Sequence, residues 1–235
     1  MHIGSRLKMV AALCPASTTL ADIGTDHAYL PVFLVLEGKI KKAIAGDIVP
    51  GPCEAAQRTV RTYHLEQQIN VRQGSGLTIL SPGEAETIVM AGMGAGTMRD
   101  ILAASPEIWQ EPSCQHLILQ PQNESEKLRH WAEDNGWEIC REELVEEADR
   151  LYEVLHLCPH PGWKYPSSCY TVGANLVERQ HPLLGRLLQE HIKKIKRQLQ
   201  GMEKSEHARQ SFSYEKACMQ LKQWEALQDG GKETC

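Results

Sequence analysis

The strongest fold signal in the chain is Leu20-Ala21-Asp22-Ile23-Gly24-Thr25-Asp26-His27-Ala28-Tyr29-Leu30-Pro31, where an apolar strand meets an acidic residue, a glycine turn and a helix start. Gly24 allows a tight turn and a close approach to a ligand, and the amides after Asp26 open the next helix at its positive dipole end. A dinucleotide-binding turn would need two more glycines, and Asp26 and Tyr29 occupy their places. The stretch therefore predicts a nucleotide-cofactor site and disfavours NAD.

Three further apolar segments end in an acidic or glycine-rich turn. They are Ala43-Ile44-Ala45-Gly46-Asp47, Ile69-Asn70-Val71-Arg72-Gln73-Gly74-Ser75-Gly76-Leu77 and Thr87-Ile88-Val89-Met90-Ala91-Gly92-Met93-Gly94. Helical stretches separate these strands, as in βα units. Ligands of open parallel sheets bind outside the carboxyl ends of the strands, so we expect the turns to meet at one crevice. Asp47 is placed there to accept hydrogen bonds from ribose hydroxyls.

The rest of the first 160 residues fits the same α/β pattern. A fifth strand is predicted at 116–121, and 137–144 with 151–157 form a closing hairpin. Short helices are predicted over 9–13, from 98 to 104 and over 127–135, with Ser5-Arg6-Leu7 just before the first of them. The prediction is therefore an α/β fold with one seven-stranded, mostly parallel sheet.

The order of the motifs resembles the bacterial S-adenosylmethionine-dependent family that methylates N1 of the adenine at tRNA position 22. The motifs are Asp-x-Gly-x-Asp-His-Ala-Tyr-Leu-Pro, Ala-Gly-Asp, Gly-x-Gly-Leu, Ala-Gly-Met-Gly, Leu-Gln-Pro and Tyr-Glu-Val-Leu, and they span nearly the whole chain. The resemblance implies a Rossmann-like class I methyltransferase fold with six parallel strands and one reversed. Two positions depart from the family: Ser75 replaces a common Asp that binds the adenine amino group, and Asp47 replaces a common Glu.

The strand-end turns and the resemblance together define the expected S-adenosylmethionine site. Its residues are Asp22, Gly24, Thr25, Asp26, His27, Asp47, Ile48, Gly74, Ser75, Gly76, Leu77, Ala91, Gly92 and Met93. Enzymes that methylate exocyclic amines usually carry Asn or Asp, two prolines and an aromatic residue after the fourth strand. The corresponding segment here, 91–94, has no side-chain acceptor and no aromatic ring, which favours N1 over N6 as the methyl acceptor.

Two residues are expected to act in catalysis. Adenine N1 is largely unprotonated near neutral pH, so positioning should supply most of the rate. Asp26 is the candidate that stabilises the cationic product and accepts the proton from N6, with helix capping as the alternative. Met93 is expected to pack on the cofactor or the base.

Arg6 and Tyr29 are the substrate-binding candidates of the first domain. The Watson–Crick edge of the target adenine is engaged in folded tRNA, so the base must flip out before transfer. Tyr29 is a stacking partner for that base, or packs on its own helix; Arg6 contacts phosphate or substrate, or is merely solvated.

Charge separates the two ends of the chain. Residues 1–175 carry 14 basic and 22 acidic side chains, a net of −8, whereas residues 176–235 carry 11 and 8, a net of +3. Apolar residues recur at helical spacing over 184–202 and again over 217–227, which predicts a coiled-coil-like helical hairpin. Lys193, Lys194, Lys196 and Arg197 make it the expected tRNA-docking element. The alternative is a dimerisation coiled coil, and a monomer is favoured.

Proline and glycine residues crowd the segment before this hairpin. We therefore expect a methyltransferase domain over 1–158, a linker over 159–174 and the hairpin over 175–235. No apolar run reaches the length of a membrane span and no signal peptide is present, so a cytoplasmic protein is expected.

The eight cysteines are scattered and include no C-x-x-C pair. His156, Cys158 and His160 are the closest group with metal-ligand chemistry, and alternate residues of a strand share one face. A metal site needs a third or fourth ligand that the local sequence does not supply, so no metal is expected. Disulfides are not expected in a reducing cytosol.

Two other functions remain open. A methyltransferase acting on another RNA position or on a small molecule would share the cofactor turns, with the C-terminal helices serving dimerisation. A non-catalytic binding module would not transfer a labelled methyl group to bulk tRNA.

Overall fold

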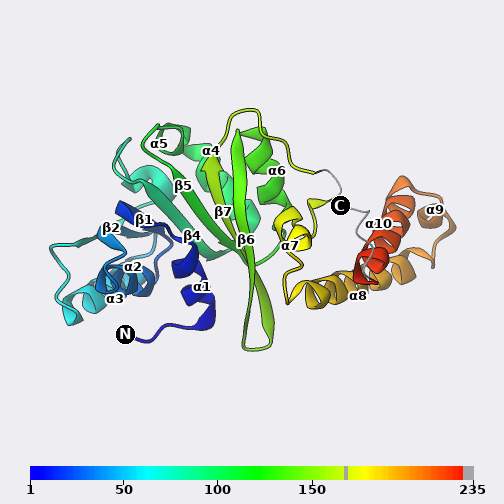
Figure 1. The fold of residues 1–235 in the computed structure, drawn as a ribbon, viewed down its shortest axis with the longest axis horizontal. Helices are drawn as coiled ribbons and strands as arrows, with labels where there is room; N and C mark the ends of the chain where they lie inside the picture. The colour runs from blue at the N-terminus through cyan, green and yellow to red at the C-terminus, as the bar shows by residue number, and fades with distance from the viewer. Residues whose placement is uncertain (167–168, 230–235) are drawn as a thin grey trace. The chain divides into compact units, whose positions relative to one another are not determined.

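One seven-stranded sheet forms the core of the N-terminal part of a computed structural model, which describes residues 1–166 and 169–229 (Figure 1). Its strands are β1 (Ser17–Ile23), β2 (Ile40–Asp47), β3 (Ile69–Gln73), β4 (Thr87–Met93), β5 (His116–Pro121), β6 (Trp137–Glu147) and β7 (Arg150–Pro159). They lie in the order β3-β2-β1-β4-β5-β7-β6. Of these seven, only β7 runs against its neighbours, which confirms the expected six parallel strands and one reversed.

The strand order changes direction between β1 and β4. The chain moves outward through β2 and β3, then returns to place β4 on the other side of β1. This switch point is where the loops after neighbouring strands diverge, and where ligands of doubly wound folds bind. The topology therefore places the site at the ends of β1 and β4.

Helices cover both faces of the sheet. They are α1 (Ser5–Leu13), α2 (Tyr29–Leu36), α3 (Pro50–Thr62), α4 (Ala95–Ala104), α5 (Pro106–Trp109) and α6 (Glu126–Asp134). Buried residues of α1, α2 and α3 share one cluster with strand residues, whereas Trp109 of α5 packs edge-on against Trp131 of α6 and Trp137 of β6. Consecutive residues of β5 are buried because both of its sides are covered.

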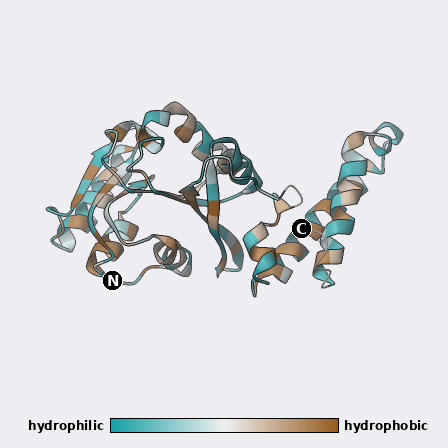
Figure 2. Ribbon diagram, turned by 45° about the horizontal axis from the view of Figure 1, so that its top comes forward, coloured by the Kyte–Doolittle hydropathy of each residue, from teal (hydrophilic) through white to brown (hydrophobic). Residues whose placement is uncertain are grey.

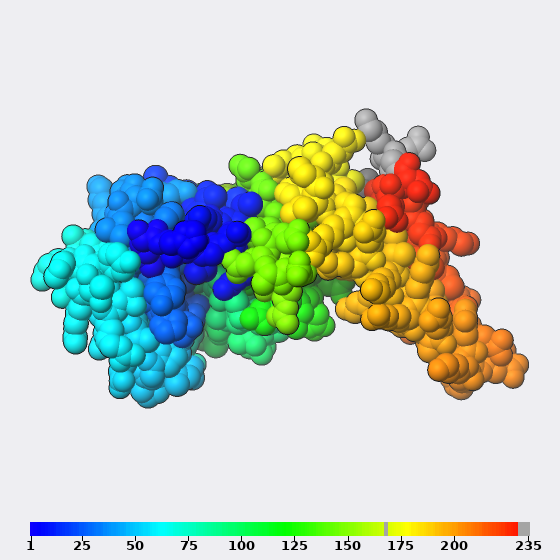
Figure 3. Space-filling model, turned by 90° about the horizontal axis from the view of Figure 1, so that it is seen from below, coloured from blue at the N-terminus to red at the C-terminus, as the bar shows by residue number. Residues whose placement is uncertain are grey.

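The ends of several elements differ from the sequence prediction. Helix α1 begins at Ser5, so the segment expected to precede it forms its first turn; it lies against β6 and β7, dark blue beside green in Figure 3. Strand β3 ends at Gln73, and a short 3₁₀ turn, η1 (Gly76–Ile79), replaces its expected end. Glycine ends the ladder there because it adopts backbone angles that strands do not use.

The chain folds as two compact units, Met1–Tyr165 and Pro166–Cys235. The second contains α7 (Ala174–Glu178), α8 (Leu184–Met202), α9 (Glu206–Arg209) and α10 (Phe212–Gln228). Helix α8 has the predicted bounds, and the polar stretch after it contains the short α9. Figure 2 shows hydrophobic and hydrophilic residues interspersed along the C-terminal helices, and on α8 the hydrophobic ones form one buried face, as in amphipathic helices.

The two long helices of the second unit pack on each other. The buried face of α8 consists of Leu187, Leu188, Ile192, Ile195 and Leu199. Helix α10 contributes the buried Ala217 and Trp224, and the Trp224 ring lies 5.1 Å from that of His191. The apolar faces therefore bury each other within one chain. Among the described residues, no helix has both the length and the apolar character needed to cross a bilayer.

Candidate functional site

Two cavities lie at the carboxyl ends of the parallel strands, and Gly24 lines both. The larger cavity, of about 440 Å³, is lined by seven of the expected cofactor residues: Asp22, Gly24, Thr25, Asp26, His27, Ala91 and Gly92. The smaller cavity, of about 330 Å³, is also lined by seven: Gly24, Asp47, Ile48, Gly74, Ser75, Gly76 and Met93. The turns predicted to meet at one crevice thus surround two adjoining spaces.

Gly24 occupies a turn that a larger residue could not easily adopt. Its φ of +75° lies in the left-handed region, and its N–H donates to the Gly46 carbonyl at 2.8 Å. A Cβ at this position would lie 2.8 Å from Cε of Met93. The first turn therefore depends on glycine mainly for its backbone angles, and the flexible end of Met93 lies where a side chain at this position would go.

Asp22 is a buried carboxyl group at the end of β1. The Thr25 hydroxyl donates to its Oδ2 at 2.6 Å. Burial raises the pKa of Asp22 to about 6, partly opposed by the Thr25 hydrogen bond, and the negative charge of Asp47 raises it further. A cation in the larger cavity would favour the ionised form.

Asp26 points away from the protein core, with 70% of its side chain exposed. Its φ of 53° is left-handed, and the residue that caps α2 is Ala28, not Asp26. The capping role considered for Asp26 is therefore wrong, and its carboxylate borders the larger cavity.

Tyr29 begins α2 and lines the larger cavity. Its ring stacks on that of His27, with centroids 5.1 Å apart and an angle of 14° between the planes. The side chain is nevertheless 43% exposed. The two rings thus stack on each other, and His27 Nε2 lies 3.6 Å from Oδ2 of Asp26.

Asp47 faces the smaller cavity from the end of β2. Its Oδ1 accepts a hydrogen bond of 2.9 Å from the N–H of Val49, which fixes the turn. Ser75 is exposed and lines the same cavity, whereas Leu77 is fully buried and lines neither. The structure thus brings all the expected cofactor residues except Leu77 to the cavities.

Arg6 is held in place at the edge of the larger cavity. Its Nη1 donates to Oε1 of the buried Gln120 at 2.7 Å, and its guanidinium lies 5.7 Å from the Tyr152 ring centre. The Glu147 carboxylate accepts from the Arg6 backbone N–H at 3.1 Å. Arg6 is therefore a positioned cation rather than a freely solvated one.

Sequence reasoning missed Gln122. It follows β5 and lines the larger cavity, and its Nε2 donates to the Gly92 carbonyl at 2.6 Å. The signal was its place directly after Leu-Gln-Pro, at the end of the strand beside β4. Other lining residues that the prediction left out are Leu7, Leu30, Ile23, Gly46, Thr97 and Ile101.

The four basic candidates of the second unit lie on α8, and all are exposed. Lys196 pairs with Glu225 of α10 at 2.7 Å. Lys193, Lys194 and Arg197 form no ion pair with any of the described residues. Three cations of this helix are thus available to an anionic partner.

The cysteine and histidine predictions need correction. Cys140 and Cys158 form a disulfide, so the expectation that no disulfide forms is wrong for this pair. His160 does not join His156 and Cys158, because its Nδ1 pairs with Glu138 at 2.8 Å. The third neighbour of that group is His116.

Comparison with known proteins gives a family model described as "Methyltransferase domain", which matches residues 3–155. A curated relative is the tRNA (adenine(22)-N(1))-methyltransferase of Bacillus subtilis, 39% identical over 155 residues, which are 66% of this chain and 64% of that protein. The match spans less than two thirds of the length of each curated relative, at 64%, 60% and 59%.

Solved structures match over nearly the whole chain. A Streptococcus pneumoniae protein titled "putative tRNA (m1A22) methyltransferase" is 30% identical with a TM-score of 0.88, covering 97% of this chain and 100% of that one. A second structure of it, in complex with S-adenosyl-L-methionine, has a TM-score of 0.84 at 30% identity, covering 95% and 98% of the two chains.

Proposed function

Because the chain belongs to the methyltransferase-domain family, we propose that it transfers a methyl group from S-adenosylmethionine to N1 of adenine 22 in tRNA. The observation that carries the proposal is the pair of cavities meeting at Gly24. One suits a nucleoside and the other offers an open, acidic space for an acceptor base. Neighbouring cavities of these two kinds are what a transfer between cofactor and nucleobase requires.

The smaller cavity fits the adenosine part of the cofactor. Asp47 can accept hydrogen bonds from both ribose hydroxyls, and charge-assisted bonds of this kind are the strong ones. Gly74 and Gly76 keep the wall free of side chains, and Ser75 offers a hydroxyl in place of the carboxylate common in the family. Asp22 and Gly24, which line the larger cavity, would then bind the positively charged methionine part of S-adenosylmethionine.

Bound S-adenosylmethionine supplies an electrophilic methyl group, which adenine N1 takes with its lone pair while the electrons of the broken carbon–sulfur bond stay on sulfur. The adenine ring then carries a positive charge until a proton leaves N6. Asp26 can stabilise that charge and accept the proton, because its carboxylate borders the larger cavity and is exposed. Met93 lines the smaller cavity, and its Cε approaches Gly24, which lines both cavities.

The flipped adenine is proposed to enter the larger cavity. Tyr29 and His27 offer an aromatic face for stacking, and Arg6 offers a fixed cation for the neighbouring phosphate. The segment 91–93 offers only backbone carbonyls to the exocyclic amine, and those of Gly92 and Met93 already accept hydrogen bonds from Gln122. Stacking and the phosphate contact would hold the base in place, whereas an acceptor for its exocyclic amine would favour adenine.

The helical hairpin expected over residues 175–235 is proposed to dock tRNA. Residues 1–175 carry a net charge of −8, so binding a polyanion needs cations from elsewhere. Lys193, Lys194 and Arg197 supply them on one exposed helix face, to which Lys196, paired with Glu225, also belongs. Since α8 and α10 bury their apolar faces against each other, we further propose a monomer, acting in the cytoplasm where tRNA is modified.

The test is methylation of a defined tRNA transcript by the purified protein with labelled S-adenosylmethionine. Incorporation should map to position 22 by nuclease digestion and mass spectrometry, and a transcript with guanine at position 22 should stay unlabelled. Label at another position would place the enzyme on a different RNA site. No label in any tRNA, with retained cofactor binding, would favour a small-molecule substrate.

A further inference from the structure

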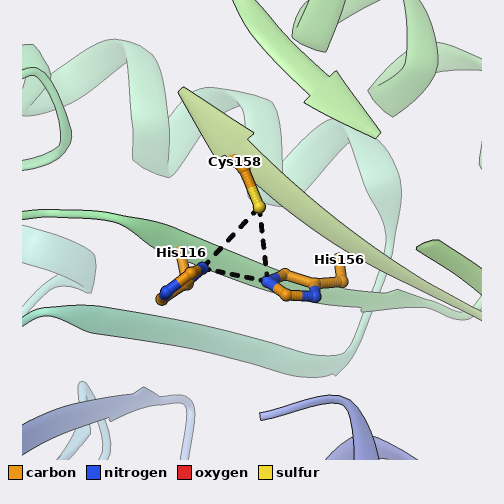
Figure 4. A group of neighbouring side chains, drawn as sticks. All are labelled: His116, His156 and Cys158. Atoms are coloured by element: carbon orange, nitrogen blue, oxygen red, sulfur yellow. Dashed lines mark hydrogen bonds between the residues drawn. The ribbon is translucent and has the colours of Figure 1, made fainter. Parts of the chain in front are cut away.

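Three potential metal ligands meet on the sheet at a distance from the cavities (Figure 4). They are His116 at the start of β5, and His156 and Cys158 on β7. His116 Nδ1 lies 3.0 Å from His156 Nε2, and Cys158 Sγ lies 3.7 Å from each of these nitrogens. The register explains the meeting: Leu117 pairs with Leu157 and Ile118 with His156, so His116 and Cys158 are neighbours across the strands.

These separations match the edges of a tetrahedral zinc site. Zinc binds imidazole nitrogen at about 2.0–2.1 Å and thiolate sulfur at about 2.3 Å, which places ligand atoms about 3.3 Å (N to N) and about 3.6 Å (N to S) apart. The observed triangle of 3.0, 3.7 and 3.7 Å thus needs adjustments of only a few tenths of an ångström. All three side chains are half-buried, so an ion can reach them while the sheet holds them in place.

A fourth candidate ligand, Cys140, lies on β6. Cys140 lies in the irregular segment between Ile139 and Arg141, where the pairing of β6 with β7 shifts by one residue. Its sulfur is bonded to that of Cys158, with the two Cα atoms 6.2 Å apart. When that bond is reduced, two thiols and two imidazoles share one location, which is the Cys₂His₂ set of structural zinc sites.

We propose that His116, His156, Cys158 and Cys140 form a zinc site in the reduced protein, and that the Cys140–Cys158 disulfide is the metal-free alternative of the same site. Reduction of the disulfide takes two electrons and two protons, which a dithiol supplies while it is oxidised to its own disulfide. Zinc then displaces a proton from each thiol as it binds. Oxidation of the two thiolates by a disulfide reverses the step and releases the ion.

The position of the site indicates a structural role. Its ligands come from three neighbouring strands, β5, β7 and β6, so the ion would tie the closing hairpin to the parallel part of the sheet. His116 opens β5, whereas Gln122 of the larger cavity follows its other end, six residues and roughly 20 Å further along. Zinc should therefore raise thermal stability without entering the methyl-transfer site.

The test uses the full chain, freed of metal with a chelator, reduced with a dithiol and then titrated with cobalt(II) under argon. One equivalent should give the intense visible bands of tetrahedral cobalt and a thiolate charge-transfer band, and zinc should displace both. Cys158→Ser should reduce the thiolate charge-transfer band and weaken binding by about tenfold or more. His156→Asn should weaken binding to a similar extent while the thiolate band is kept. The disulfide form of the parent protein should bind at least about tenfold more weakly than the reduced form.

Two variants serve as matched controls. His160→Ala removes the neighbouring histidine that pairs with Glu138, and Cys114→Ser removes a buried free thiol two residues before His116. Both should bind cobalt like the parent protein. Absence of tetrahedral cobalt in the reduced parent would overturn the proposal, as would equal affinity in Cys158→Ser. Circular dichroism verifies that each variant is folded. If Cys158→Ser is unfolded, the cobalt affinity of His156→Asn and the cobalt spectrum of the reduced parent protein test the proposal instead.

Discussion

Met93 fills the space that a side chain on Gly24 would need, since a Cβ at Gly24 would lie 2.8 Å from Cε of Met93. Gly24 lines both cavities, and Met93 lines the smaller one. The contact links the end of β1 to the end of β4 at the switch point of the sheet. Substitutions on either side of it should therefore act on the cofactor site before they act on the fold.

Gly24→Ala should weaken S-adenosylmethionine binding by about tenfold or more, because the left-handed backbone costs an alanine about 1–2 kcal/mol and its methyl group pushes Met93. Gly38→Ala is the matched control: Gly38 has a φ of +68° but nothing within 4 Å of its Cβ position. The Gly38→Ala protein should lose about as much stability as Gly24→Ala and keep the parent protein's affinity for S-adenosylmethionine. Isothermal calorimetry and thermal unfolding measure both, and equal affinities in the two variants would contradict the account.

Asp47→Ala should weaken cofactor binding by about tenfold or more, since each charge-assisted hydrogen bond is worth about 1.5–3 kcal/mol. Asp47→Asn separates the two roles of this residue. It retains an oxygen for the N–H of Val49, which Oδ1 now accepts at 2.9 Å, but loses the charge toward the ribose. An intermediate affinity is expected for Asn. Unchanged affinity in a folded Asp47→Ala protein would remove Asp47 from the site.

Asp26→Asn should slow methyl transfer more than it weakens binding. Asparagine tolerates the left-handed backbone at this position, where φ is 53°, so the fold should be unaffected. Single-turnover rates at saturating tRNA and cofactor isolate the chemical step. A rate equal to that of the parent protein would show that Asp26 is not the group that stabilises the charged product.

The raised pKa of Asp22 makes stability depend on pH. The folded protein keeps the proton up to a pKa of about 6, whereas the unfolded chain loses it near the ordinary value of 3.8. The folded state therefore binds more protons between these values, and the free energy of unfolding should fall by about 3 kcal/mol as pH rises from about 4 to about 6. Urea unfolding of the cofactor-free protein measures this fall. Asp22→Asn should lack this part of the slope, and identical profiles would show that Asp22 titrates normally.

Replacing Lys193, Lys194 and Arg197 by Gln should weaken tRNA binding and lower the slope of log affinity against log salt by about 0.9 for each lost phosphate contact. Lys216 and Lys222 of α10 are also exposed and provide the control. Their replacement by Gln changes charge on the same unit without touching the α8 face. Filter binding at several salt concentrations compares the variants. If the α8 variant and the α10 variant lose tRNA affinity equally, the effect comes from the overall charge of the unit and not from a docking face on α8.

Periodic and local signals in the sequence were enough for the fold. Apolar strands that end in Asp22, Asp47 and the glycine pairs identified four of the seven strands and their common edge, because such turns are formed by neighbours in the chain. The long helix was predicted with its observed bounds for the same reason. Element ends depart from the apolar pattern. Helix α1 begins at Ser5 and strand β3 ends at Gln73, because packing and the backbone angles of glycine set these ends.

Contacts between distant segments needed the tertiary structure. Gln122 reaches the cavity because β5 lies beside β4, and Arg6 is fixed by Gln120 and Glu147, more than a hundred residues away. The sequence leaves helix capping open as a role for Asp26, whereas in the structure the backbone after Gly24 delays the helix until Tyr29.

The α/β fold, the strand-end turns and the basic α8 could be predicted because each depends on spacing along the chain. Which side chains come together in space depends on contacts between distant segments. Sequence grouped His156 and Cys158 with His160, two residues further on; strand register instead brings His116 from β5 and Cys140 from β6 to them. The physical reason is that pairing between strands is set by burial of the whole sheet, which no local window of sequence contains.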